Sequence, residues 1–162
     1  MNPPLTRIRF WLIVIIVGLV ISGVTAFPLR HELNLLSTWL VGADASWNPA
    51  DHSGLAHWIL LVREGLEVTY QKYHFIAYGT DWLAFGHLVI ALFFIPPYKD
   101  PVRYIGNIHM GILACFGIFA LALICGPIRG IPFYWRLIDC SFGLVALYPL
   151  WRILKLSREL QA

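Results

Sequence analysis

Residues 10–27 read FWLIVIIVGLVISGVTAF, a stretch without a single charged side chain. A helix needs roughly 20 apolar residues to cross the hydrocarbon core of a bilayer, which is about 30 Å thick. The stretch therefore predicts a membrane-spanning helix. Val24-Thr25-Ala26 also has the small-x-small pattern of a secretory signal cleavage site. Because Pro28 follows so closely, we expect the segment to be retained as the first span, over about residues 10–27.

The rest of the chain has the same apolar character. Of its 162 residues, 59% are hydrophobic and 13% are charged, and the mean hydropathy is +0.69. Soluble domains carry about a quarter charged residues, and a chain of this length cannot bury so much apolar surface in a water-soluble core. Composition therefore predicts a single-domain, all-α integral membrane protein, with the lipid bilayer as its first partner. The net charge of +3 is scattered along the chain, so we expect no nucleic-acid partner.

Three further spans are predicted, over about residues 81–97, 105–126 and 134–154. The last is unusual, because only twelve residues separate Asp139 from Arg152, too few for a crossing. This helix must begin near Tyr134, which places Asp139 below the outer interface, while the long side chain of Arg152 can reach the inner headgroups. Pro149 is expected to kink the helix or to open it locally. We expect the four spans to pack as a bundle.

The positions of the basic residues predict the orientation. Seven lie near the N-terminus, in the loop between the second and third spans, or at the C-terminus: Arg7, Arg9, Lys99, Arg103, Arg152, Lys155 and Arg158. Five others are spread over much more chain on the opposite side. Since Lys and Arg concentrate on the cytoplasmic side, both termini are expected in the cytoplasm. Residues 28–80 are then expected outside.

This long outer segment divides into two parts. Its first half contains turn-favouring residues and is predicted to be a loop: Gly42, Asp44, Ser46, Asn48, Pro49 and Asp51. In the second half, a helical period separates an apolar face from a polar one, with Leu60 and Ala77 as exceptions on the polar face. The apolar face comprises Leu55, Trp58, Ile59, Val62, Leu66, Tyr73, Phe75 and Ile76, and the polar face His57, Arg63, Glu64, Glu67, Gln71, His74, Tyr78 and Asp81. We predict an amphipathic helix that lies in the membrane interface or caps the bundle and ends at Gly79.

Ionisable groups at membrane depth are costly, and each is a functional candidate for that reason. His87 lies in the second span, and with Asp81 and Asp139 it forms the set of candidate catalytic residues. The candidate ligand-binding residues lie at the outer level: Glu64, Glu67, His74, Arg129 and Arg136. Arg136 is three residues before Asp139 and is expected to pair with it. We predict an outward-facing polar cavity that binds a small or membrane-soluble ligand or moves a proton on it, although these charges also fit an ordinary solvated surface.

Two cofactors, haem and a metal ion, are alternatives to a site formed by side chains alone. A b-type haem would use histidines such as His87 and His109, but these differ by roughly 14 Å in depth, so one iron cannot bind both. Glu64 and Glu67, with His57 and His74, supply carboxylate and imidazole groups for a metal ion. However, the Glu-x-x-His pairs of ferritin-like bundles are missing. The sequence favours neither cofactor.

A third interpretation is a structural or accessory subunit of a membrane complex, without chemistry of its own. Gly111 and Gly117 in the third span allow close helix contact, within the chain, in a homo-oligomer or with a membrane-protein partner. The three cysteines have no zinc-binding spacing and are expected to be buried. Cys125 and Cys140 lie near the outer ends of neighbouring spans, where an oxidising compartment would allow a disulfide.

Overall fold

The computed structural model describes residues 3–161. About 85% of the chain is helical, and no strand occurs in this range. Four helical stretches are long and apolar enough to cross a membrane: Pro4–Ala26, Gly54–Lys99, Ile105–Ile128 and Phe133–Glu159. By length and composition, the prediction of an all-α, multi-pass membrane protein is confirmed.

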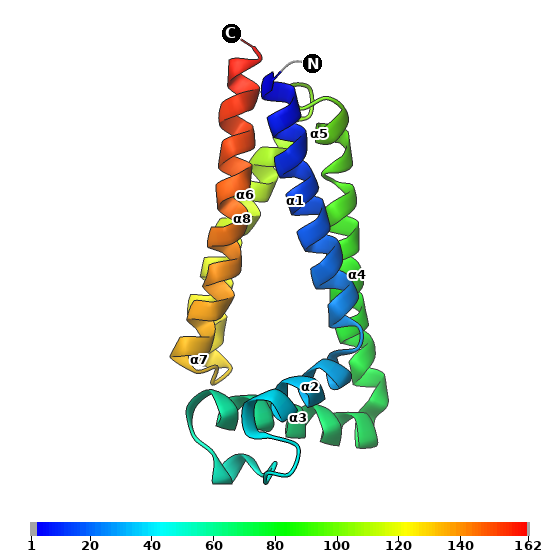
Figure 1. The fold of residues 1–162 in the computed structure, drawn as a ribbon, viewed down its shortest axis with the longest axis vertical. Coiled ribbons are helices and arrows are strands. Elements are labelled where there is room, and N and C mark those ends of the chain that lie inside the picture. The colour runs from blue at the N-terminus through cyan, green and yellow to red at the C-terminus, as the bar shows by residue number, and fades with distance from the viewer. Residues whose placement is uncertain (1–2, 162) are drawn as a thin grey trace. The chain divides into compact units, whose positions relative to one another are not determined.

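The elements follow one another along the chain with short connections (Figure 1). They are α1 (Pro3–Ala26), α2 (Leu29–Val41), η1 (Pro49–Asp51), α3 (Gly54–Tyr73), η2 (His74–Ile76), α4 (Ala77–Leu92), α5 (Ile95–Lys99), α6 (Ile105–Ala120), η3 (Leu121–Cys125), α7 (Gly126–Ile128) and α8 (Phe133–Glu159). Their contacts define two compact units, Met1–Leu19 with Ile90–Ala162, and Val20–Val89. Each unit is described separately below.

The second apolar stretch is 46 residues long, more than twice what a bilayer requires. Its first helix, α3, carries Arg63, Glu64, Glu67 and Lys72, so the apolar part that can cross is α4 with the turn that follows it. The predicted helix end at Gly79 is wrong. The break lies at η2, and α4 runs through Gly79, whose φ is not positive. A glycine ends a helix only where the backbone adopts the left-handed conformation.

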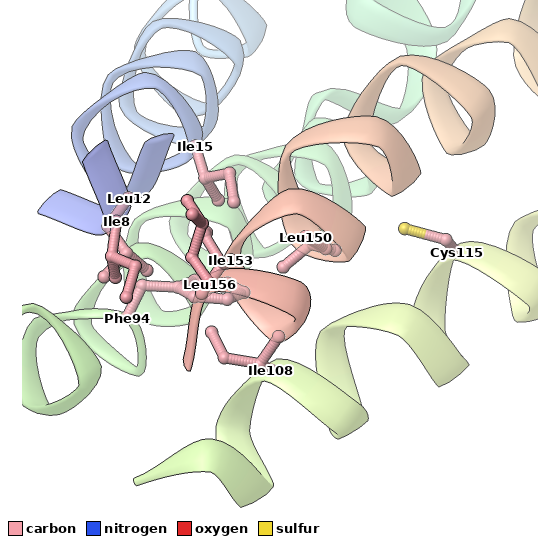
Figure 2. Packing of buried hydrophobic residues seen from close by; sticks show 9 residues of the cluster. All are labelled: Ile8, Leu12, Ile15, Phe94, Ile108, Cys115, Leu150, Ile153 and Leu156. Atoms are coloured by element: carbon pink, nitrogen blue, oxygen red, sulfur yellow. The ribbon is translucent and has the colours of Figure 1, made fainter. Parts of the chain in front are cut away.

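The core of the unit formed by residues 1–19 and 90–162 lies between α1, α6 and α8. Figure 2 shows its side chains: Ile8, Leu12 and Ile15 of α1, Phe94 in the turn before α5, Ile108 and Cys115 of α6, and Leu150, Ile153 and Leu156 of α8. Farther along, α6 and α8 approach closely at Gly143, where a Cβ atom would lie 3.1 Å from the carbonyl oxygen of Cys115. A small residue therefore sets the distance between these helices.

Two irregular features occur in the same unit. After α6 the chain continues through a five-residue π-helical segment, η3, and a short helix, α7, before α8 begins. Helix α8 starts at Phe133, next to the predicted start at Tyr134, and continues without a break through the buried Pro149. The predicted local opening of the helix at this proline is not observed.

The unit formed by residues 20–89 contains a helix that the sequence analysis missed. Helix α2 lies beside α3 and contacts it (Figure 1), and both helices carry buried residues, Leu33 and Ser37 in α2 and Ile59 and Leu60 in α3. Leu60, an apparent exception on the polar face, is only 1% exposed because α2 covers that face. In the same unit, a Cβ atom at Gly23 of α1 would lie 2.8 Å from the carbonyl oxygen of Ala84 in α4.

Candidate functional site

His87 lies on the inward-facing stripe of α4. Helical spacing places it in line with Thr80, Ala84 and Ala91. Both alanines are buried, and His87 itself is partly buried. Its Nδ1 lies 2.9 Å from the carbonyl oxygen of Leu83, one turn earlier. A carbonyl can only accept, so Nδ1 donates this hydrogen bond and Nε2 is the ring nitrogen left for other contacts.

Asp139 occupies the corresponding stripe of α8. Gly143, Ala146 and Leu150 follow it at helical spacing, and all three pack inward, while Asp139 is partly buried. The predicted ion pair between Asp139 and Arg136 is not observed among the described residues. The fold of the neighbouring turn explains the difference.

Arg136 turns toward α7 instead of toward Asp139. Its side chain lies across Gly126, where a Cβ atom would collide with it, and its guanidinium lies 5.2 Å from the ring centroid of Phe133. The Arg136 Nε is buried and has no hydrogen-bond partner in the described part of the chain. Because Gly126 has no side chain, the Arg136 side chain fills the space over it and does not pair with Asp139.

Glu67 is the predicted site residue with the best-defined partners. The guanidinium of Arg30 donates two hydrogen bonds to its carboxylate, both 2.7 Å long, and the amide of Gln71 donates a third at 3.1 Å. The pKa of Glu67 lies below its ordinary value because the Gln71 hydrogen bond stabilises the ionised form; desolvation opposes this, and Arg30 adds to it. These contacts join α2 to α3.

Arg63 of α3 forms a second link, to α2 and to the segment that follows α2. Its Nε donates to Oδ1 of Asn34 at 2.6 Å, and its guanidinium lies 4.4 Å from the ring centroid of Trp47. Arg30 and Asn34 were not predicted as partners, because the segment that forms α2 was expected to be a loop. The signal was present in the pattern of α2, whose Leu33 and Ser37 lie one turn apart on its buried face.

The remaining predicted residues lie apart from these contacts. Glu64 and His74 are exposed, Asp81 is partly buried in the second turn of α4, and Arg129 is exposed at the C-terminal end of α7. Glu67 is thus brought together with Arg30 and Gln71. Within the described range, Glu67 forms no hydrogen bond or ion pair with Glu64 or His74.

The residues weighed for a metal ion do not form a cluster. Within residues 3–161, no group of three or more His, Cys, Asp or Glu side chains is placed to hold one. His57 donates from Nδ1 to the carbonyl oxygen of Pro49 at 2.8 Å and so supports the turn before α3. Cys125 is exposed and Cys140 is buried, and both are free thiols. His109, the second haem candidate, is exposed on α6.

Two surface hollows stand out, and both lie on the unit that contains α6 and α8. One is apolar and is lined by both helices, and the other lies at the C-terminal end of α8. Neither includes a residue predicted above as catalytic or ligand-binding.

Comparison of the sequence with protein-family models gives no match, and comparisons with curated proteins and with solved structures give none either.

Proposed function

We propose that this chain is a four-helix membrane bundle that binds a small or membrane-soluble ligand, and that His87 exchanges a proton with it. In this proposal residues 28–80 lie outside, the α2–α3 pair rests at the outer interface, and both termini are cytoplasmic. The positions of the basic residues support this orientation. The four apolar helices supply the membrane environment for the ligand.

The observation that carries the proposal is the geometry of His87. Burying an imidazole on the inward stripe of an apolar helix costs free energy, and a residue retained at such a cost is a candidate functional group. The hydrogen bond from Nδ1 to Leu83 fixes one tautomer and the orientation of the ring, which leaves Nε2 to accept a proton from a bound molecule or to return it. Asp139 lends separate support, since it is a second ionisable group on an inward stripe of a spanning helix.

The test compares His87→Ala with His109→Ala in lipid nanodiscs. Each protein is incubated with a membrane lipid extract and washed, and the retained small molecules are identified by mass spectrometry. Wild type and H109A should enrich the same compound over empty nanodiscs. H87A should retain at least about tenfold less, the effect of losing one hydrogen bond to a charged group. Equal retention by H87A, or no enrichment by wild type, contradicts the proposal.

The acid–base step has its own readout. If Nε2 exchanges a proton with a carbon of the ligand, wild-type protein in heavy water should accelerate deuterium incorporation at that carbon of the retained compound, and H87A should not. Incorporation at the same rate with both proteins would leave His87 as a binding group only and would refute the proton exchange.

Haem is a second candidate for the same geometry. An iron-ligating histidine commonly donates its other ring N–H to a carbonyl, as His87 does to Leu83. An absorption spectrum of the purified protein separates the two candidates. A Soret band that H87A abolishes would establish haem, whereas its absence from the wild-type protein would leave the ligand-binding proposal.

A further inference from the structure

The outer surface of the α6–α8 pair carries an apolar groove of about 450 Å³. This volume lies in the range of small-molecule sites, about 300–1,000 Å³. The groove is lined by Ile112 and Phe116 of α6 and by Leu144, Leu147, Tyr148 and Trp151 of α8. Phe116 is 56% exposed and Leu144 59% exposed, so the groove opens outward from this helix pair. In a spanning segment such a surface meets hydrocarbon chains.

A second hollow, of about 460 Å³, continues the groove toward the end of α8. The two share Trp151 and Leu154, and the second adds Lys155, Arg158 and Glu159. Both basic side chains are exposed, and no ion pair within 4.0 Å involves either of them in the described part of the chain. The three ionisable groups carry a net charge of +1, so the apolar groove leads into a cationic end.

The dimensions match one leaflet of a bilayer. From Leu144 to Arg158 the helix rises about 21 Å, at 1.5 Å per residue. A bilayer with its headgroup regions is about 40–45 Å thick, so one leaflet measures roughly 20–22 Å. Trp151 lies where the apolar and cationic parts join, which is the level that tryptophan prefers at membrane interfaces.

We propose that this surface binds an anionic phospholipid, with an acyl chain in the α6–α8 groove and the phosphate at Lys155 and Arg158. The apolar part provides van der Waals contact along a chain, and the two cations provide charge complementarity for the headgroup. This end of α8 is also the end that the positions of the basic residues predict to be cytoplasmic, where anionic lipids concentrate. The site is independent of His87 and of the ligand proposed for it.

The test measures lipid retention after transfer from nanodiscs of defined composition into detergent. The nanodiscs contain phosphatidylcholine alone or a mixture with phosphatidylglycerol, and native mass spectrometry counts the lipids that remain bound. The charge variant is K155Q/R158Q. Its matched control, K99Q/R103Q, removes the same charge from exposed residues on the same predicted side but outside the groove. Melting temperatures in phosphatidylcholine nanodiscs verify that the variants fold.

Wild type and the control should retain phosphatidylglycerol in preference to phosphatidylcholine. Each basic residue near an anionic lipid surface contributes roughly fivefold in affinity, so K155Q/R158Q should lower phosphatidylglycerol affinity about 25-fold. Equal retention by the charge variant, or an equal loss in the control, would overturn the proposal.

A second variant tests the acyl-chain half without altering charge. Leu144→Trp fills the groove from an exposed position and should lower lipid retention while leaving the melting temperature unchanged. If the groove instead receives a helix of a partner or of a second copy, L144W will change the oligomeric state and leave phosphatidylglycerol retention as in wild type. That result would also overturn the proposal.

Discussion

At the residue scale, Gly23 marks a point where α1 and α4 can approach only because a side chain is missing. A Cβ atom there would lie 2.8 Å from the carbonyl oxygen of Ala84, and backbone cannot move aside as a flexible side chain can. Gly23→Ala should therefore destabilise the protein by about 1–3 kcal/mol, the usual cost of overpacking. Thermal unfolding in detergent measures this loss.

Gly18 provides the control for Gly23, because it lies in the same helix with nothing within 4 Å of its Cβ position. Gly18→Ala should change the free energy of unfolding by no more than about 0.5 kcal/mol. Equal losses from both substitutions would mean that the close contact at Gly23 does not matter to stability.

Glu67 gives the α2–α3 pair a dependence on pH. Its pKa is lowered in the folded state, so its contribution to stability is present above the ordinary pKa of 4.5 and is lost as the pH falls through the lower, folded-state value. Trp47, which stacks on Arg63 beside this pair, reports the change by fluorescence. Acidification should loosen the pair in the wild-type protein.

Two variants separate Glu67 from the other acids. Glu67→Gln should remove much of the acid transition, and Glu64→Gln, an exposed acid without an ion pair within the described residues, should keep it. An unchanged transition in E67Q would refute the role of the Arg30–Glu67 contact. The effect should be small, because exposed ion pairs are well screened.

Single residues were only partly predictable from the sequence. His87 and Asp139 stand out because they interrupt apolar stretches, and that signal needs no structure. The partner of Arg136 could not be predicted in the same way. Its spacing from Asp139 allows a pair, but the space left by Gly126, which belongs to another helix, decides where the side chain lies.

At the scale of elements, the contact between α6 and α8 depends on Gly143. A Cβ there would lie 3.1 Å from the carbonyl oxygen of Cys115 and 3.3 Å from the ring of Phe119. Gly143→Leu should separate the two helices and destabilise the protein by about 1–3 kcal/mol, measured by unfolding in detergent. Gly117→Leu, with nothing within 4 Å of its Cβ position, should be nearly neutral, and an equal cost for both would contradict the assignment.

Helix α2 shows why some elements are hard to recognise in a sequence. Long uncharged apolar stretches identified the candidate spans directly, because a bilayer requires about 20 apolar residues for a crossing. The polar face of α3 was interpreted as lining an outward-facing polar cavity, or as an ordinary solvated surface. Arg63 and Glu67 of that face instead hydrogen-bond to α2, and Leu60 is buried, so this part of the face is an interface between helices. Only the partner helix reveals this.

At the scale of the whole molecule, the proposed topology has all four apolar helices crossing the membrane, which would place both termini on one side. The loop between α2 and α3 would then lie on the opposite side from Lys99. Composition and length are enough to predict such helices, because the requirement for a long apolar helix comes from the bilayer and not from a particular protein partner.

Cysteine accessibility in intact cells tests this topology most directly. In a background where Cys115, Cys125 and Cys140 are replaced by alanine, single cysteines are placed at the exposed positions Ala45, Lys99 and Gln161. A membrane-impermeant maleimide should label A45C in intact cells, and K99C and Q161C only after permeabilisation. Labelling of A45C and K99C from the same side would contradict the four-span account.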